Sequence, residues 1–279
     1  MEHPAKLWVG DTAYWTRSQL AGHLRTLGLR PGDAVMVHVG LRAVGPVLGG
    51  PDTLIGALRD AVGPVGTLLC YVNWEQQYED ALDPHGRLPE ALKPHIPPFE
   101  ALRSRASRDH GAFAELFRTT PGAVRSGNPG ASVAALGHRA EWFTTDHPLH
   151  YGYGTDSPFG RLVAARGKSL LLGAPLDTLS LLHHAEHLAR IPHKRVCRME
   201  VPFYADGRTE WRMIEEFNTA DPVVDGLPET YFATVVEEFL ATGAGQRGRV
   251  GDAPAVLVPA AEVVAFGVRW LEQHAPSPR

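Results

Sequence analysis

The chain has 279 residues, of which 44% are hydrophobic and 21% are charged, and its formal net charge is −4. This composition is ordinary for a globular protein and excludes the basic surface on which nucleic-acid binding depends. Two cysteines exclude a disulfide framework, and no run of 18 apolar residues marks a membrane span. We therefore expect a cytoplasmic protein without nucleic-acid or membrane partners.

The first predicted elements form a β-α-β unit, which indicates a partly parallel sheet. An amphipathic helix opens at residues 16–20, with Leu20, Leu24 and Leu27 at helical spacing. It is followed by a buried strand at 34–38, a glycine-rich loop at 39–50, a helix from 51 to about 62 and a strand at 67–72.

Residues from about 80 to 108 differ from the rest of the chain. Five prolines fall there and few apolar positions recur at a helical or strand period. A loop of this length in a compact domain is usually functional or disordered. We expect an irregular loop or lid at about 80–108.

The β/α pattern then resumes and continues to the end of the chain. The predicted helices lie at 112–117, 159–165, 176–189, 231–242 and 260–274. The predicted strands lie at 132–136, 169–172 and 255–258, with a hairpin of strands 195–204 and 209–217. Without a repeat or a Ser/Gly-rich linker, one elaborated domain over 1–279 is favoured over two.

The helix predicted at 176–189 carries the densest cluster of reactive side chains. It follows an apolar strand, and the strand-to-helix turn is where α/β proteins gather ligands. His183 and His187 share one helix face and Glu186 lies between them, in the order His-x-x-Glu-His of some zinc peptidases. The same segment also suits a single histidine acting as a general base. Both interpretations stay open from these residues alone.

Several common nucleotide and nucleophile motifs are absent. Gly167-Lys168-Ser169 ends like a phosphate-binding loop, but Leu162 stands where the first glycine belongs. The sequence contains neither a Gly-x-Ser-x-Gly elbow nor a Gly-x-Gly-x-x-Gly turn after a strand. These absences argue against an NTPase, an α/β-hydrolase and a dinucleotide-binding enzyme.

Seven ordered segments carry a resemblance that covers about residues 16–275. The segments are residues 37–45 with 49–51, residues 63–68, residues 108–111, residues 125–129, residues 146–148, residues 157–159 and the histidine helix. This series resembles the aminoglycoside 3-N-acetyltransferases, which are unrelated in fold to the GNAT acetyltransferases. The resemblance implies a single α/β domain with helices layered around a mixed, partly parallel sheet.

The resemblance also implies an activity, the transfer of acetyl from acetyl-CoA to the 3-amino group of a 2-deoxystreptamine ring, giving antibiotic resistance. A protonated amine has no lone pair, so a base has to remove its proton. His183 matches the family's histidine and is the expected base, without a metal and without a covalent acyl-enzyme. Glu215 or Glu216 is expected to hydrogen-bond to it, and only one of two neighbours on a strand can face it.

The loop after residue 38 resembles the family's CoA-binding loop, where small residues let backbone N–H groups approach the ligand. Family members often carry His-Ser-Ser-Leu here, so this chain lacks two hydroxyl groups at Val39 and Gly40. The expected acetyl-CoA contacts are His38, Val39, Gly40, Leu41, Arg42, Ala43, Val44, Ser126, Asn128 and Ser157.

An aminoglycoside carries several ammonium groups, so its site should offer carboxylates and aromatic faces. The expected substrate contacts are Tyr71, Trp74, Glu75, Asp109, Asp177 and Asp221. Two alternatives accompany this interpretation: a zinc-dependent hydrolase using His183, His187 and Glu186, and a non-catalytic protein that binds aminoglycosides.

Overall fold

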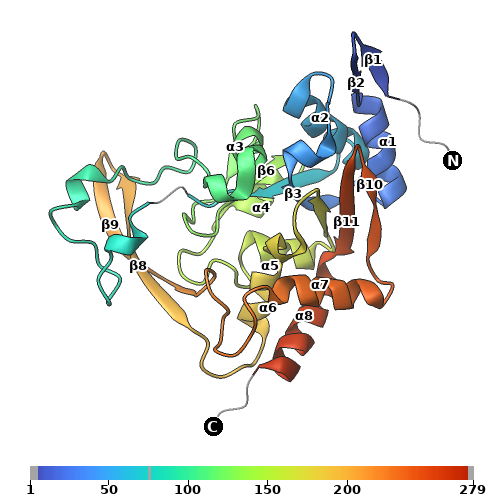
Figure 1. Cartoon of the computed structure of the whole chain (residues 1–279). Helices are drawn as coiled ribbons and strands as arrows, with labels where there is room; N and C mark the ends of the chain where they lie inside the picture. Colours follow the sequence, from blue (N-terminus) through green and yellow to red (C-terminus); the bar gives the residue numbers. More distant parts are fainter. Residues whose placement is uncertain (1–5, 75–76, 276–279) are drawn as a thin grey trace.

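A seven-stranded sheet lies at the centre of the computed structural model, which describes residues 6–74 and 77–275 (Figure 1). The strand order is β10-β11-β7-β3-β4-β6-β5. The strands are β3 (Ala34–Val39), β4 (Thr67–Tyr71), β5 (Val124–Arg125), β6 (Val133–Gly137), β7 (Lys168–Leu172), β10 (Gln246–Val250) and β11 (Ala253–Pro259). β3 runs parallel to β4 and β7, and the other neighbours are antiparallel. The predicted mixed, partly parallel sheet is confirmed.

Helices cover both faces of this sheet. The helices are α1 (Arg17–Leu27), α2 (Gly50–Val62), α3 (Gly111–Arg118), α4 (Ala140–Thr144), α5 (Pro158–Ala164), α6 (Leu182–Leu188), α7 (Tyr231–Ala241) and α8 (Ala260–His274). Side chains alternate across β3, so Val35 and Val37 pack with α1, α2 and α3, whereas Met36 packs with α5 to α8. Both faces of β3 are therefore buried, and its carboxyl end opens between the two layers.

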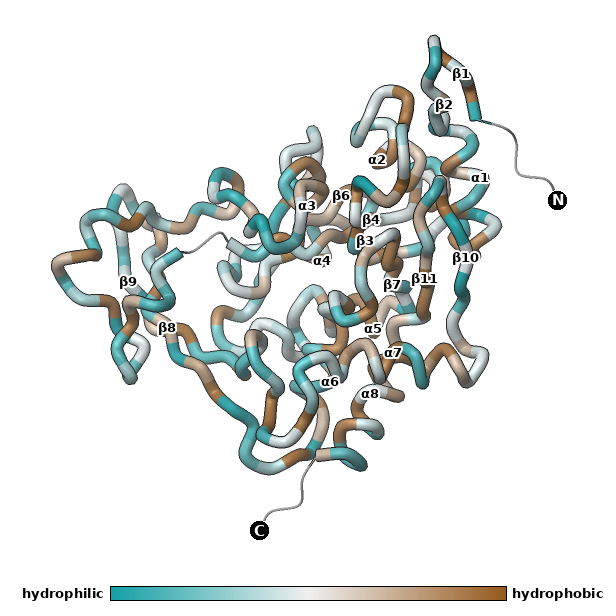
Figure 2. The backbone as a smooth tube through the Cα atoms, viewed as in Figure 1, coloured by the Kyte–Doolittle hydropathy of each residue, from teal (hydrophilic) through white to brown (hydrophobic). Residues whose placement is uncertain are grey.

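The hydropathy pattern follows this layering. In Figure 2 hydrophobic positions concentrate along β11 and the helices that pack on the sheet, while the outlying loops are mostly hydrophilic. Among the residues described, no helix combines the length and the hydropathy that crossing a bilayer requires.

Two hairpins extend from opposite ends of the molecule (Figure 1). The predicted one consists of β8 (Val196–Ala205) and β9 (Arg208–Phe217), joined through Asp206 and Gly207, both at positive φ as a tight hairpin turn requires. The other, β1 (Leu7–Val9) with β2 (Thr12–Tyr14), was not predicted. Its strands have three residues each, too few to show an alternating pattern.

The proline-rich segment packs against the long hairpin. Between residues 80 and 108 the regular structure is limited to short 3₁₀ turns, as the composition predicts. Phe99 N–H donates to Pro202 O at 2.8 Å, and Phe99, Leu88 and Val201 share a small apolar cluster. Arg125 fastens the end of this segment to the sheet, because its guanidinium donates to Ser104 O and Val72 O. The middle of the segment thus forms one body with the hairpin.

The histidine helix is shorter than predicted. The prediction of one helix over 176–189 is wrong, because a 3₁₀ turn spans Leu176–Thr178 and α6 begins only at Leu182. Thr178 N–H donates to Pro175 O at 3.2 Å, and Ser180 N–H donates to Thr178 O at 2.8 Å. Neither bond is the i→i−4 bond of an α-helix. The break places His183 in the first turn of α6, at the edge of the sheet where β3 and β7 end.

Gly40 is held by close packing. A Cβ added there would lie 2.1 Å from Gly173 O, at the loop that follows β7. We predict that Gly40→Ala lowers the free energy of unfolding by about 1 to 3 kcal/mol, because the two loops have to separate. Denaturant unfolding of both variants checks this against Gly22→Ala, an open helical position where alanine should be neutral or stabilising. Equal midpoints for the two variants would contradict the packing argument.

Candidate active site

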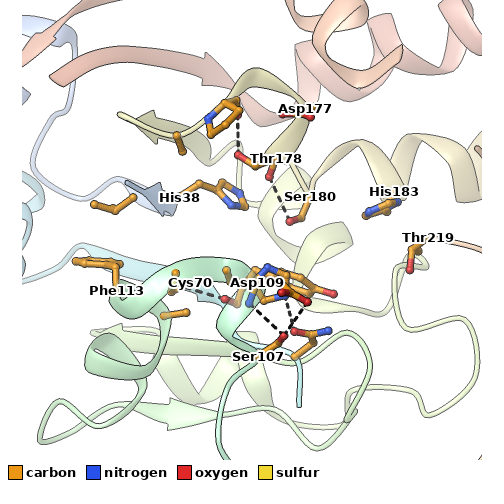
Figure 3. Close-up of a pocket in the computed structure, with 18 of the residues that line it drawn as sticks. His38, Cys70, Ser107, Asp109, Phe113, Asp177, Thr178, Ser180, His183 and Thr219 are labelled. Atoms are coloured by element: carbon orange, nitrogen blue, oxygen red, sulfur yellow. Dashed lines mark hydrogen bonds between the residues drawn. The ribbon is translucent and has the colours of Figure 1, made fainter. Parts of the chain in front are cut away.

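A cavity of about 850 Å³ opens where β3 and β4 end (Figure 3). Its walls come from these two strand ends, from the segment after β4, from residues 107–114, from residues 174–183 and from Thr219 and Ala220. The segment after β4 supplies Asn73, Trp74, Gln77, Glu79 and Asp80. The carboxyl ends of parallel strands form such a crevice because the chain turns away to opposite faces of the sheet there. The cavity therefore lies where the strand-end argument predicts a ligand.

The lining of the cavity combines two kinds of side chain. Part of the wall is small or apolar: Val37, Val39, Gly40, Cys70, Phe113, Ala114, Ala174 and Pro175. Carboxylates line other parts of it, namely Glu79, Asp80, Asp109 and Asp177, and none of the described lining residues is Lys or Arg. Figure 3 shows Phe113 and Thr219 at opposite ends, with His38, Ser180 and His183 between them.

A smaller cavity of about 160 Å³ adjoins the first. Asn73, Glu79, Thr219 and Ala220 line both, and Glu216 lines the smaller one. The region beyond His183 is therefore acidic and continuous with the main cavity. Such a surface suits a ligand with several positive charges.

His183 is oriented by a buried carboxylate. Its Nδ1–H donates to Glu186 Oε2 at 2.6 Å, and the Tyr231 hydroxyl donates to the other oxygen of Glu186. The Glu186 side chain is 3% exposed, while that of His183 is 17% exposed and lines the cavity. Tyr153 and Phe232 pack on the His183 ring, with centroids 4.9 and 4.8 Å away. The bond at Nδ1 leaves Nε2 as the nitrogen free to meet a ligand.

This geometry corrects the expected partner of His183. Glu215 does not reach it, because its carboxylate accepts hydrogen bonds from Tyr151 and Arg198. Glu216 is not its hydrogen-bond partner either, since Oε1 accepts from Phe217 N–H at 2.8 Å. The helical spacing of His183 and Glu186, three residues apart, is the signal that could have found the pair. Tyr231, from α7, had no signal in the sequence.

Glu216 acts on the site through its charge. Burial raises the pKa of its carboxyl to about 7, and the bond from Phe217 N–H and the nearby His183 oppose this rise. A carboxyl with such a pKa loses its proton readily when a cation arrives beside it. It remains close to the base without orienting it.

The predicted CoA loop only partly faces the cavity. His38, Val39 and Gly40 line it, whereas the next residues form a 3₁₀ turn, Leu41–Val44. Val44 is wholly buried in the α1–α3 core, so a direct ligand contact there is wrong. Leu41 and Ala43 pack against the same core, and Arg42 is exposed beside them. None of these three lines the cavity.

Three polar residues predicted to contact CoA are buried within the protein. Ser157 caps α5, accepting from Gly160 N–H at 3.2 Å, and Ser126 accepts from Val133 N–H at 3.0 Å. Both residues have no exposed surface, so the predicted direct contacts are wrong. The Asn128 side chain donates a hydrogen bond to Pro148 O and accepts one from Ala131 N–H, and Asn128 lines the smaller cavity.

The structure brings most predicted substrate residues together. Tyr71, Trp74, Asp109 and Asp177 line the main cavity. Tyr71 shares a hydrogen bond with the Tyr153 hydroxyl at 2.6 Å, which ties it to the ring that packs on His183. Glu75 lies outside the described residues.

Other acidic and polar groups differ from the prediction. Asp221 is exposed, accepts a bond from Asn218 and lines neither cavity. Glu79, Asp80, Asn73 and His110, which do line the main cavity, were not predicted. They belong to the segment after β4 and to its return before α3, where the sequence has no periodic signal.

The zinc interpretation has no geometric support. His183 Nδ1 and Glu186 are bonded to each other, and His184 Nδ1 bonds to Tyr153 O at 2.6 Å. Over the part of the chain that the structure describes, no group of three or more His, Cys, Asp or Glu side chains is placed to hold a metal ion.

Cys70 is a poor nucleophile although it lines the cavity. Burial raises the pKa of its thiol to about 12, so the reactive thiolate is scarce at neutral pH. An acylated cysteine intermediate is thus disfavoured. His183, which also lines the cavity, is placed for proton transfer.

Known proteins are similar to this chain in sequence. A family model described as aminoglycoside 3-N-acetyltransferase matches residues 36–272. Aminoglycoside N(3)-acetyltransferase III of Pseudomonas aeruginosa is 44% identical, over 93% of this chain and 94% of that protein. Aminoglycoside N(3)-acetyltransferase VIII of Streptomyces fradiae is 45% identical, over 93% and 92% of the two chains. The chain belongs to this family.

Solved structures of aminoglycoside 3-N-acetyltransferases agree with the fold. AAC-IIIb in a binary complex with CoASH superposes with a TM-score of 0.93 at 60% identity, covering 95% of this chain and 100% of that one. AAC-VIa bound to sisomicin superposes with a TM-score of 0.89 at 38% identity, covering 95% of this chain and 100% of that one. The predicted family, its fold and an acyltransferase enzyme are confirmed.

The pKa of Glu216 predicts a pH dependence of stability. Between pH 4.5 and about 7 the folded protein keeps a proton that the unfolded chain releases, so stability falls as pH rises through this window. Glu216→Gln should remove this slope and gain on the order of 1 to 3 kcal/mol over wild type by pH 8. Denaturant unfolding of both proteins from pH 4 to 8 measures the difference. Parallel curves would contradict it.

Proposed function

We propose that this protein transfers the acetyl group of acetyl-CoA to the 3-amino group of the 2-deoxystreptamine ring of an aminoglycoside. The observation that carries the proposal is the His183–Glu186 pair, which faces a cavity lined by small apolar residues and by carboxylates. The CoASH complex of AAC-IIIb and the sisomicin complex of AAC-VIa support the two ligands. Acetylation turns an ammonium group into a neutral amide, which is a route to antibiotic resistance.

The lining of the cavity supports a separate place for each of the two substrates. A pantetheine arm is thin and uncharged, so it fits the small apolar walls around Gly40, Phe113 and Ala174. The aminoglycoside is a polycation, so it fits the end with Glu79 and the adjoining Glu216. The acyl carbon and the amine then meet between His38 and His183.

The reaction proceeds by direct attack. The uncharged amine attacks the thioester carbon, its nitrogen forms the new C–N bond, and the carbonyl electron pair moves to oxygen. His183 Nε2 takes the proton that the amine loses, and Glu186 stabilises the resulting imidazolium through Nδ1. The C–S bond then breaks, its electron pair goes to sulfur, and the His183 proton neutralises the thiolate.

The proline-rich segment contributes to the acceptor side. Its beginning supplies Glu79 and Asp80 and its end supplies Ser107 and Asp109 to the cavity wall. Because its middle is packed on the β8–β9 hairpin, we propose that segment and hairpin together cover the bound aminoglycoside.

Release of CoA thiol in the presence of acetyl-CoA and a panel of aminoglycosides tests the function. Turnover with a product acetylated at the 3-amine supports it. Tight aminoglycoside binding without transfer at saturating acetyl-CoA would instead support the non-catalytic binder.

Two variants on α6 separate the proposed base from the zinc alternative. His183→Ala should lower kcat/KM by about 10²- to 10⁴-fold, because the general base is lost. His187→Gln should stay within a few-fold of wild type, since His187 does not line the main cavity. Steady-state rates of both variants measure this. A comparable loss of activity in both variants, together with stoichiometric zinc in the purified wild type, would favour the zinc alternative instead.

A further inference from the structure

His38 occupies an unusual position for a polar side chain. It lies at the end of β3, on the wall of the main cavity, and its Nε2 is buried without a hydrogen-bond partner in the described structure. An unsatisfied buried polar atom costs about 1 to 3 kcal/mol, and a hydrogen bond to a ligand or to a bound water removes this cost. His38 therefore places a hydrogen-bonding group without a protein partner in the wall of the cavity.

The surroundings of His38 keep its imidazole uncharged. Burial and the nearby His110 lower its pKa to about 3. Two other titratable groups on the cavity wall, Tyr71 and Cys70, have raised pKa values and are also neutral at pH 7. An imidazole with so low a pKa is too weak a base to take the proton of the amine, but in its neutral form it always carries one N–H to donate.

The place of His38 relative to His183 fits one role in acyl transfer. In Figure 3 the two rings lie on either side of Ser180, with His38 on the side of Phe113 and His183 on the side of Thr219. The proposed acetyl donor arrives from the side of Phe113 and the amine from the side of Thr219. An acyl carbon that lies between the two rings is then flanked by His38 on the donor side and by His183 on the amine side.

We propose that His38 donates a ring N–H to the acyl oxygen of the thioester and stabilises the negative charge that develops there during attack. The proposal rests on the acetyl transfer proposed above. In the balanced step the carbonyl electron pair moves onto this oxygen as the C–N bond forms, and it returns as the C–S bond breaks. His38 keeps its proton throughout, in contrast to His183.

Two substitutions at His38 test the donor. His38→Leu removes the N–H while keeping an apolar side chain, and His38→Gln retains an N–H donor near the position of Nε2. We expect His38→Leu to lower kcat by about 10²- to 10³-fold with little change in KM for the amine, as for loss of one oxyanion donor. The kcat of His38→Gln should be at least tenfold higher than that of His38→Leu. Equal losses in the two variants, or a wild-type kcat in His38→Leu, would overturn the proposal.

A second measurement does not depend on turnover. A ketone analogue of acetyl-CoA, labelled with ¹³C at the carbonyl, is bound to wild type and to both variants, and its carbonyl stretch is recorded by infrared difference spectroscopy. A donated hydrogen bond lowers this frequency in wild type and His38→Gln relative to His38→Leu. The same frequency in all three proteins would contradict the donor. An inactive wild type that still shows the shift would instead count against the proposed acceptor.

Discussion

The bond between Glu186 and His183 is the interaction on which the site depends. A carboxylate that is 3% exposed is costly to bury, and here two donors satisfy it, the imidazole of His183 and the hydroxyl of Tyr231. Because Tyr231 belongs to α7, packing of the C-terminal helices fixes the carboxylate. The carboxylate in turn fixes the ring of His183. Removing any of the three leaves a buried polar group without its partner.

The break before α6 makes this arrangement possible. A continuous helix from residue 176 would carry the chain past the end of β7 without the tight turn at Ser180. With the turn, His183 points into the cavity while His184 is buried behind it, bonded to Tyr153 O. The same turn sets Ser180 between His38 and His183, so the loops after β3 and β7 define the centre of the cavity together.

The sequence predicts the framework well because its signals are local. The β3–α2–β4 unit, the long hairpin and α8 follow from periodicity and turn residues, and the resemblance supplies the family. The site is harder, because its contacts join segments distant in the chain. Glu186 carries a local signal, since it is spaced three residues from His183, whereas the expected partners, Glu215 and Glu216, lie on a strand far along the chain. Ser126 and Ser157 look like ligand donors in the sequence, and only burial shows that they serve the backbone.

Comparing Glu186→Gln with Glu215→Gln tests the central claim most directly. Both changes keep side-chain size and remove one charge, but only Glu186 is bonded to His183. Steady-state kinetics with acetyl-CoA and an accepted aminoglycoside should show kcat falling by about 10²-fold or more in Glu186→Gln, because the imidazolium loses its partner. Glu215→Gln should remain within a few-fold of wild type. A large loss in Glu215→Gln with near-normal Glu186→Gln would contradict the account.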